Sequence, residues 1–145
     1  MKTSMQNYDS KKMSKAVGRN LPFSFKVAYE VAKYIRGMKV DRAIHELEEV
    51  QKIKKAIPYT RYNRDTPHRR GAMASGRYPE KAARYIIPLL KSLKTNAEDK
   101  GIEGELEIVH SAAKKPSIRR RYGRVKGIKR VTHFELVAMP EEVKK

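Results

Sequence analysis

Two segments, ELEIVHSAA at residues 105–113 and VTHFELVAM at residues 131–139, decide the fold of this chain. In both segments apolar side chains alternate with polar ones, which is the period of a β-strand that buries one face. We therefore expect the two segments to pair as an extended β-hairpin that covers residues 105–139. The side chains expected on its buried face are Leu106, Ile108, Phe134, Leu136 and Ala138.

The sequence between the two strands, residues 114–130, is too basic to fold by itself. Nine of its seventeen residues are Lys or Arg, and no Asp or Glu occurs between Glu107 and Glu135. Ordering a backbone costs about 1–2 kcal/mol per residue, and this segment has few apolar side chains to offset that. We expect an arm that reaches ~30 Å beyond the sheet and becomes ordered only on a polyanion. The alternative is a solvated basic loop, but the density of Arg around Tyr122 and Gly123 favours nucleic acid.

The composition points to the same class of partner. The chain has 145 residues, a net charge of +18 and a pI near 10.2. This excess is larger than solubility requires, and it predicts binding to nucleic acid or to an anionic surface. The length fits one domain with tails. We expect an intracellular protein without disulfides or a membrane span, because the sequence has no Cys, no long apolar run and no apolar core of a signal peptide.

Three helices and one further strand are expected outside the hairpin. The helical spacing of apolar residues predicts helices at about residues 24–36 and 41–56, and a third from residue 79 to Gly101. A short edge strand is expected within residues 13–21. The buried positions expected on the second helix are Ile44, Leu47, Val50 and Ile53.

Local signals predict how these helices begin and bend. Ser24 and Asp41 are expected to cap the first turns of the first two helices, because short polar side chains accept hydrogen bonds from free backbone N–H groups. Pro88 is expected to kink the third helix, because it has no N–H to donate to Arg84.

We expect a single domain over residues 13–139, with a disordered basic tail at residues 1–12 and a charged tail at residues 140–145. Between the second and third helices, residues 58–77 form a loop that is long for a compact domain, which indicates either function or disorder. It carries five Arg against one Asp, with tyrosines and a histidine among them. That composition suits phosphate contacts and base stacking. A flexible linker is the alternative interpretation.

The residue patterns of enzymes and metal sites are missing from the sequence. Its four histidines are scattered, and none is followed by a second histidine at the spacing of a zinc-binding helix; they are His45, His68, His110 and His133. There is no glycine-rich phosphate loop and no acid–base pair. We therefore expect no catalytic residue, no metal, no cofactor and no small-molecule substrate.

A series of short motifs runs in order along residues 13–139. The motifs are IRGMKV (35–40), AIPYTRYNR (56–64), HRRG (68–71), GRYPEKAA (76–83), NAEDKG (96–101), IVHSAA (108–113), GR (123–124) and VTH (131–133). Together they resemble the family of large-subunit ribosomal proteins numbered twenty-two in the universal series, in its archaeal and eukaryotic branch. The resemblance implies an α+β fold with a small antiparallel three-stranded sheet packed on three helices and a long protruding β-hairpin.

The resemblance also implies a function. It implies a structural constituent of the large ribosomal subunit that binds large-subunit rRNA, has a role in subunit assembly and works in the cytoplasm. The hairpin would line the nascent-peptide exit tunnel, with neighbouring ribosomal proteins and the nascent peptide as further partners. The residues expected to contact rRNA are Arg19, Lys26, Arg61, Tyr62, Arg64, His68, Arg69, Arg70, Arg77, Tyr78, Lys114, Lys115, Arg119, Arg120, Arg121, Arg124, Lys126, Lys129 and Arg130.

One other function class fits the composition. An architectural DNA-binding protein would insert a basic β-arm, with Pro116 at a turn, into a minor groove. Such proteins usually dimerise through a large apolar interface, and the sequence shows no spare apolar stripe for one. A free enzyme acting on RNA would need the acid–base residues that the sequence lacks.

Overall fold

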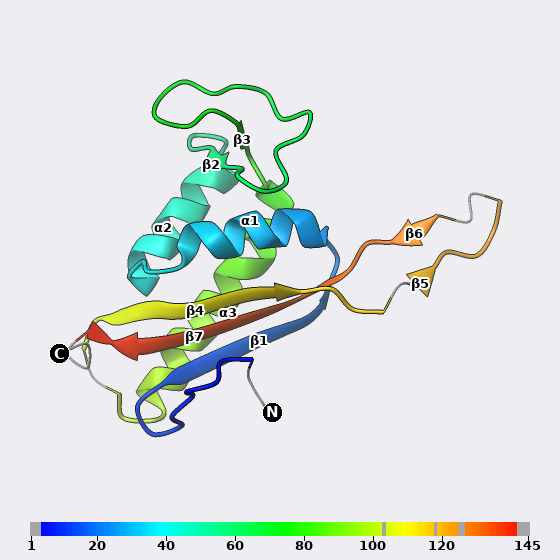
Figure 1. The fold of residues 1–145 in the computed structure, drawn as a ribbon. Coiled ribbons are helices and arrows are strands. Elements are labelled where there is room, and N and C mark those ends of the chain that lie inside the picture. Colours follow the sequence, from blue (N-terminus) through cyan, green and yellow to red (C-terminus); the bar gives the residue numbers. More distant parts are fainter. Residues whose placement is uncertain (1–3, 103, 118, 125–126, 142–145) are drawn as a thin grey trace.

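The computed structural model describes residues 4–102, 104–117, 119–124 and 127–141 (Figure 1). Within these residues the chain forms three helices and a three-stranded antiparallel sheet, which confirms the α+β class. The helices are α1 (Phe25–Ile35), α2 (Val40–Gln51) and α3 (Glu80–Glu98). The main sheet consists of β1 (Ser14–Leu21), β4 (Leu106–Lys114) and β7 (Thr132–Pro140). Two short antiparallel pairs are β2 (Ile57–Pro58) with β3 (Gly76–Arg77), and β5 (Arg119–Arg120) with β6 (Ile128–Lys129).

The central strand of the main sheet is β7, and the strand order is β1-β7-β4. Ser14 of β1 faces Ala138 of β7 on one side, and Ser111 of β4 faces Leu136 on the other. The helices lie together on one face of this sheet, as Figure 1 shows. The hairpin strands and the edge strand expected from the sequence are therefore the three strands of one sheet.

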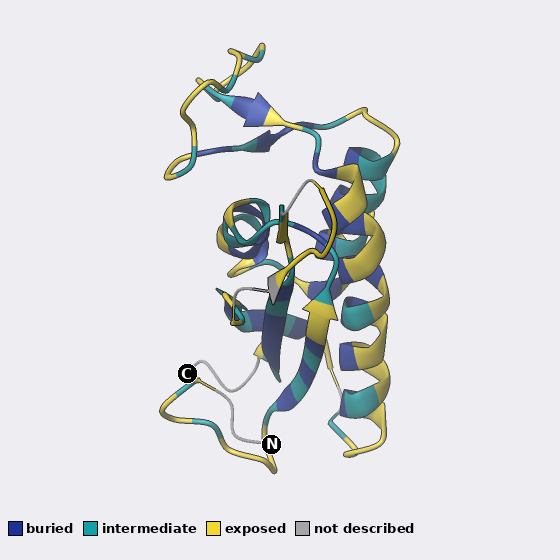
Figure 2. Cartoon of the chain, turned by 90° about the vertical axis from the view of Figure 1, so that its right-hand side faces the viewer, coloured by how far each residue is buried: buried dark blue, intermediate teal, exposed yellow. Residues whose placement is uncertain are grey.

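The core lies between the helices and that face of the sheet. Its sheet side is formed by the alternating residues of β4 and β7, and Phe134, Leu136 and Ala138 are completely buried. Each helix turns one buried face toward them and an exposed face outward, as Figure 2 shows most clearly for α3. The helices contribute Ala28, Val31, Ile35, Ala43, Leu47, Val50, Ala82, Ile86, Leu90, Leu93 and Ala97. Each large aliphatic side chain buried here contributes about 1.5–3 kcal/mol.

The strict alternation of buried and exposed residues fails in β7, because Glu135 and Val137 are buried as well. They point to the face of the sheet opposite to Phe134, since successive strand residues alternate in direction. Ser4 lies against that face, where its backbone N–H donates to Glu135 at 2.9 Å and its hydroxyl donates at 2.7 Å. Lys114 Nζ is 2.8 Å from the same carboxylate. Ser4 belongs to the N-terminal tail at residues 1–12, whose expected disorder stays a prediction.

The second helix is shorter than the sequence predicts. It ends at Gln51 instead of near residue 56, and Ile53, expected on its buried face, is 56% exposed. The cause is a left-handed backbone at Ile53, with φ of +60°, which turns the chain out of the helix toward β2. The side chain of Ile53 therefore points into solvent.

The two predicted side-chain caps are wrong. Ser24 occupies the N-cap position of α1 but makes no side-chain cap hydrogen bond, and the N-cap of α2 is Lys39 instead of Asp41. Asp41 lies in the first turn of α2, where its carboxylate is 3.0 Å from Lys94 of α3. An acid in a first turn interacts favourably with the helix dipole without capping the helix.

The third helix continues through Pro88 to Glu98. The proline ring is exposed, so it does not displace core residues of the helix. A kink at this position stays a prediction.

Beyond the main sheet the chain extends away from the helices as an arm, as Figure 1 shows. In it, Arg119 faces Lys129 and Arg120 faces Ile128, and the Arg121 N–H donates to the Gly127 carbonyl at 2.7 Å. This arrangement is compatible with the long hairpin expected over residues 105–139.

Candidate nucleic-acid interface

The basic loop at residues 58–77 is anchored to α1 by the carboxylate of Glu30. Glu30 is buried and accepts hydrogen bonds from the backbone N–H groups of Thr60 at 3.1 Å, Arg61 at 2.9 Å and Tyr62 at 2.7 Å. Three consecutive donors on one carboxylate leave this stretch of backbone little freedom. The interpretation of the loop as a freely flexible linker therefore does not hold for its first residues.

The far end of the loop is also tied down. β2 and β3 pair Ile57 with Arg77, and the Tyr59 N–H donates to the Ser75 carbonyl at 2.9 Å. Neighbouring side chains pack closely against Gly76, and a Cβ at this position would lie only 2.8 Å from Met73 Sδ. Both ends of the loop are thus held against the helical layer.

An aromatic cluster joins the loop to the start of α1. The Tyr62 ring packs edge-on against Tyr29, with centroids 5.5 Å apart, and against Phe25 at 6.3 Å. The Arg61 guanidinium lies 5.2 Å from the Tyr29 centroid and 5.5 Å from that of Tyr62. Lys26 lies 5.8 Å from the Tyr62 centroid. Such cation–π contacts position the charges while leaving them exposed for a phosphate.

The other cations of the loop are held by neighbouring rings and carbonyls. Arg69 lies 5.0 Å from the Tyr78 ring and donates from Nε to the Gly76 carbonyl at 3.3 Å. Arg77 donates to the Asp65 carbonyl at 2.9 Å. The ring of Tyr59, 6.0 Å from Arg77, is buried, and burial raises the pKa of its hydroxyl to about 12. That phenol therefore stays neutral beside the exposed cations.

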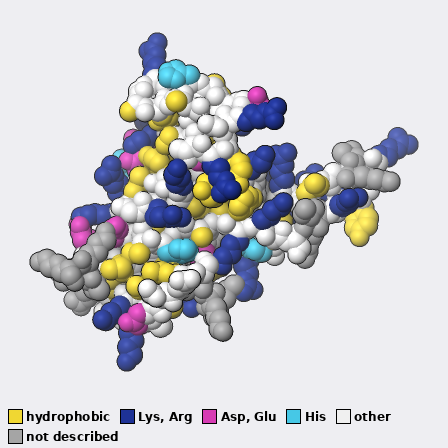
Figure 3. All heavy atoms as spheres, in the orientation of Figure 1, with side chains coloured by type: hydrophobic (Ala, Val, Ile, Leu, Met, Phe, Trp, Pro, Cys, Tyr) yellow, Lys and Arg dark blue, Asp and Glu magenta, His cyan; other side chains and the backbone are white. Residues whose placement is uncertain are grey.

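Further predicted residues of the loop lie at its surface. Arg64 is exposed and its Nε is 3.7 Å from Asp65, which is a weak contact in water. His68 Nδ1 is 2.9 Å from the Ala74 carbonyl, and Arg70 is exposed. Figure 3 shows Lys and Arg side chains spread over the loop, the body and the arm, with apolar side chains gathered between them near the arm-facing end of α1.

The base of the arm brings its cations close to the loop. One groove of about 530 Å³ is lined by Lys115, Lys129 and Arg130 of the arm together with Lys26 and Tyr62. Residues predicted from two distant parts of the sequence therefore share one surface. Lys114, next to them, pairs with Glu135, and Arg19 lies exposed at the end of β1.

The arm beyond its base presents further cations. Arg120, Arg121 and Arg124 are exposed, and the ring of Tyr122 is fully accessible. The side chain of Arg119 and the whole of Lys126 lie outside the described part of the chain.

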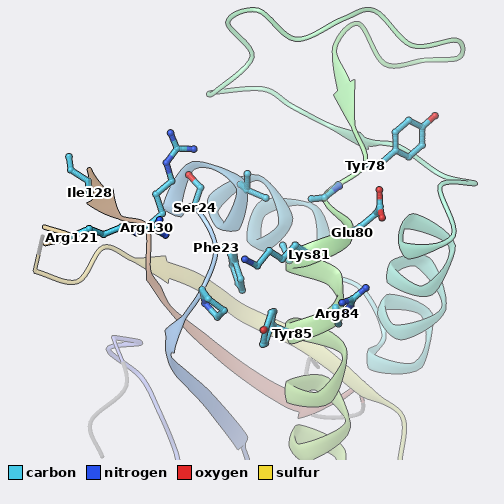
Figure 4. Close-up of a pocket in the computed structure, with 14 residues that line it drawn as sticks. Phe23, Ser24, Tyr78, Glu80, Lys81, Arg84, Tyr85, Arg121, Ile128 and Arg130 are labelled. Carbon is cyan, nitrogen blue, oxygen red and sulfur yellow. The ribbon is translucent and has the colours of Figure 1, made fainter. Parts of the chain in front are cut away.

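A second hollow, of about 770 Å³, lies on the other side of Arg130 (Figure 4). Its walls are the start of α1, the start of α3 and the arm, and it contains the tilted ring pair of Phe23 and Tyr85, 6.2 Å apart. Lys81 and Arg84 of α3 face it, and neither was predicted as a site residue. A signal was present, because the two are three residues apart on the exposed face of a helix that begins after Tyr78.

The groove of about 530 Å³ has no Asp or Glu among its described lining residues. Three glutamates, including Glu30 and Glu135, are buried, and their carboxylates accept hydrogen bonds within the protein. The third, Glu46, accepts a hydrogen bond from Tyr34 at 2.6 Å and pairs with Lys55. Burial raises the pKa of Glu46, but the hydrogen bonds from Lys55 and Tyr34 outweigh it and leave that pKa lowered. All charged side chains that line the first groove are therefore cations, whereas the second hollow also contains Glu80.

The described residues contain no group of three or more His, Asp or Glu side chains that could hold a metal ion. Within the same residues, no helix has the length and apolar content needed to cross a membrane.

Comparison with known proteins gives a consistent result. A profile of the family described as ribosomal protein L22p/L17e matches residues 16–137. Large ribosomal subunit protein uL22 of Archaeoglobus fulgidus is 44% identical over 117 residues, which cover 79% of this chain and 76% of the relative. The uL22 protein of Ignicoccus hospitalis is 40% identical over 153 residues, covering 97% and 95%. That of Hyperthermus butylicus is 38% identical over 146 residues, covering 92% and 94%.

Proposed function

Because this chain belongs to the ribosomal protein L22p/L17e family and is thus a structural constituent of the large ribosomal subunit, we propose that its basic surface binds large-subunit rRNA. The chain is archaeal in type, it is not an enzyme, and its place is in that subunit in the cytoplasm. Family membership favours this role over the architectural DNA-binding alternative.

The observation that carries the proposal is the anchored loop. Glu30 fixes the backbone of residues 60–62 before any RNA is present, and the neighbouring rings hold the Arg61 guanidinium in place. A cation whose position is already fixed loses less conformational freedom on binding a phosphate than a free side chain does. Arg also offers a planar, bidentate fork to phosphate oxygens and stacks on bases.

The arm has a different role in the proposal. It projects from the main sheet, and its described Lys and Arg side chains are exposed. We propose that the arm lines the nascent-peptide exit tunnel, with the nascent peptide near its tip and neighbouring ribosomal proteins around its base. We further propose a part in subunit assembly, since RNA that folds around a cationic arm can fix the position of that arm. Support for these finer roles comes from family membership and from the charge of the arm.

The salt dependence of binding tests the rRNA proposal. Binding of the purified protein to deproteinised large-subunit rRNA would be measured over a series of salt concentrations, with duplex DNA of equal length as the competitor. If six to ten phosphates are neutralised, the slope of log K against log salt is about −4 to −9. A slope near −1 would contradict the proposal. Equal affinity for duplex DNA would favour the architectural alternative.

A further inference from the structure

The strand pairing is interrupted between the main sheet and the arm. Pairing of β4 with β7 ends at Lys114 opposite His133, and pairing of β5 with β6 begins at Arg119 opposite Lys129. Residues 115–117 lie between the two ladders and belong to neither. The groove of about 530 Å³ lies at this interruption, between the base of the arm, the start of α1 and the loop.

The lining of this groove combines apolar walls with cationic side chains. Its walls include the rings of Phe25 and Tyr62 and the aliphatic side chains of Ile128 and Val131. Ile128 is 59% exposed, although it is apolar and stands in a basic arm. The charged side chains that line the groove are all cations: Lys26, Lys115, Lys129 and Arg130.

We propose that this groove receives one unpaired base of an RNA strand, whose flanking phosphates contact Lys115 and Lys129. This inference rests on the proposed rRNA binding and adds a defined nucleotide site to it. A base has flat apolar faces that match the ring and aliphatic walls, and its phosphates match the cationic rim. The volume lies within the range of about 300–1,000 Å³ that is typical of small-molecule sites.

The position of the groove gives the proposed site a second role. Lys26 and Tyr62 belong to the globular part, and Lys115, Ile128 and Arg130 to the arm, so an inserted base would contact both. The ladders on either side are interrupted here, and a two-stranded ribbon has little stability of its own. A base seated in the groove would therefore fix the direction in which the arm leaves the body.

The test uses full-length protein and two RNA hairpins of equal length. One hairpin carries a single bulged 2-aminopurine and the other is fully paired. We expect the wild type to bind the bulged hairpin on the order of tenfold more tightly, because stacking one base is worth about 1–3 kcal/mol and a tenfold ratio corresponds to about 1.4 kcal/mol. The 2-aminopurine fluorescence is expected to fall as the base stacks against the rings.

Two variants and one matched control locate the effect. Ile128→Ser and Phe25→Ala remove apolar wall, and Ile128 is too exposed for its replacement to disturb the core. Both are expected to reduce the preference for the bulged hairpin several-fold while affinity for the paired hairpin stays within twofold. Ile53→Ser replaces an exposed apolar side chain that does not line the groove, and it is expected to keep the preference.

The remaining outcomes distinguish failure of the nucleotide site from failure of the proposed rRNA binding. Equal binding of both hairpins by the wild type, or an unchanged preference in Ile128→Ser, would overturn the nucleotide site but leave rRNA binding intact. Binding of neither hairpin nor of rRNA would overturn the proposed function itself. Displacement of the bulged hairpin by an acidic peptide that contains phenylalanine, at equal concentration, would identify a peptide groove instead.

Discussion

The carboxylate of Glu30 in α1 accepts a hydrogen bond from the backbone N–H of Tyr62, with 2.7 Å between oxygen and nitrogen. The two residues are 32 positions apart in the sequence, and Glu30 is completely enclosed in the fold. This contact joins the helical layer to the basic loop. It makes the first residues of the loop a fixed part of the domain surface.

Replacing Glu30 with Gln is expected to destabilise the protein by about 1–3 kcal/mol, because an NH2 group takes the place of one carboxylate oxygen. The backbone N–H groups of residues 60–62 use both oxygens, so at least one of them then faces a donor in place of its acceptor. Urea unfolding measures the loss. Glu98→Gln, at an exposed position of α3, is the matched control and is expected to change stability by less than about 0.5 kcal/mol. Equal stability of the two variants would show that Glu30 does not hold the loop.

Glu46 makes stability depend on pH. Its pKa is lowered in the folded protein, mainly because hydrogen bonds from Lys55 and Tyr34 outweigh the effect of burial. A lowered folded-state pKa contributes stability above the ordinary glutamate pKa of about 4.3, and this stability is lost as pH falls through the folded value.

The corresponding measurement compares the free energy of unfolding at neutral pH and near pH 3.5. We expect the wild type to lose more stability on acidification than Glu46→Gln does. The neighbouring variant Glu49→Gln controls for the general loss of carboxylate charge. Parallel pH profiles for wild type and Glu46→Gln would contradict the prediction.

The loop and the arm are expected to do different jobs in the subunit. Replacing Arg61, Arg64, Arg69 and Arg70 with Ala removes cations held by an anchored loop, and we expect this variant to be missing from purified large subunits. Deleting residues 116–127 shortens a weakly supported ribbon, so that variant is expected to assemble but to alter passage of nascent peptides. Measuring the occupancy of each variant in purified subunits shows which segment is needed for incorporation. If the deletion is the one excluded while the loop variant assembles, the arm is the anchor.

Amide exchange in the RNA-free protein is expected to differ sharply along the hairpin. Residues 120–124 are exposed, and their backbone is paired only through the short β5–β6 ladder, so we expect their amides to exchange fast. The amides of β7 are expected to exchange slowly, because β7 is the buried central strand of the sheet. Protection of residues 119–124 comparable with that of β7 would mean that the arm is ordered without RNA.

Much of the fold followed from local patterns in the sequence. The alternation in residues 105–113 and 131–139 predicted β4 and β7 within a residue, and helical spacing predicted the three helices, because one buried face imposes a period on each element. The net charge and the clustering of Arg predicted a polyanionic partner. Charge is a sum over residues, so it needs no knowledge of how they are arranged.

The site itself depended on the tertiary structure. Nothing in the sequence near Glu30 shows that this carboxylate is buried, because the three N–H groups that make its burial possible come from residues 60–62. The apolar spacing of the second helix continues to Ile53, but the backbone at Ile53 is left-handed and turns the chain toward β2. The sequence does not show where β2 lies, so it does not predict this turn. The groove joins Tyr62 to Ile128 across 66 positions only because the sheet and α1 bring the arm base to the loop. Periodicity reports which face of an element is buried, whereas the partner of a polar group is chosen by the packing of distant segments.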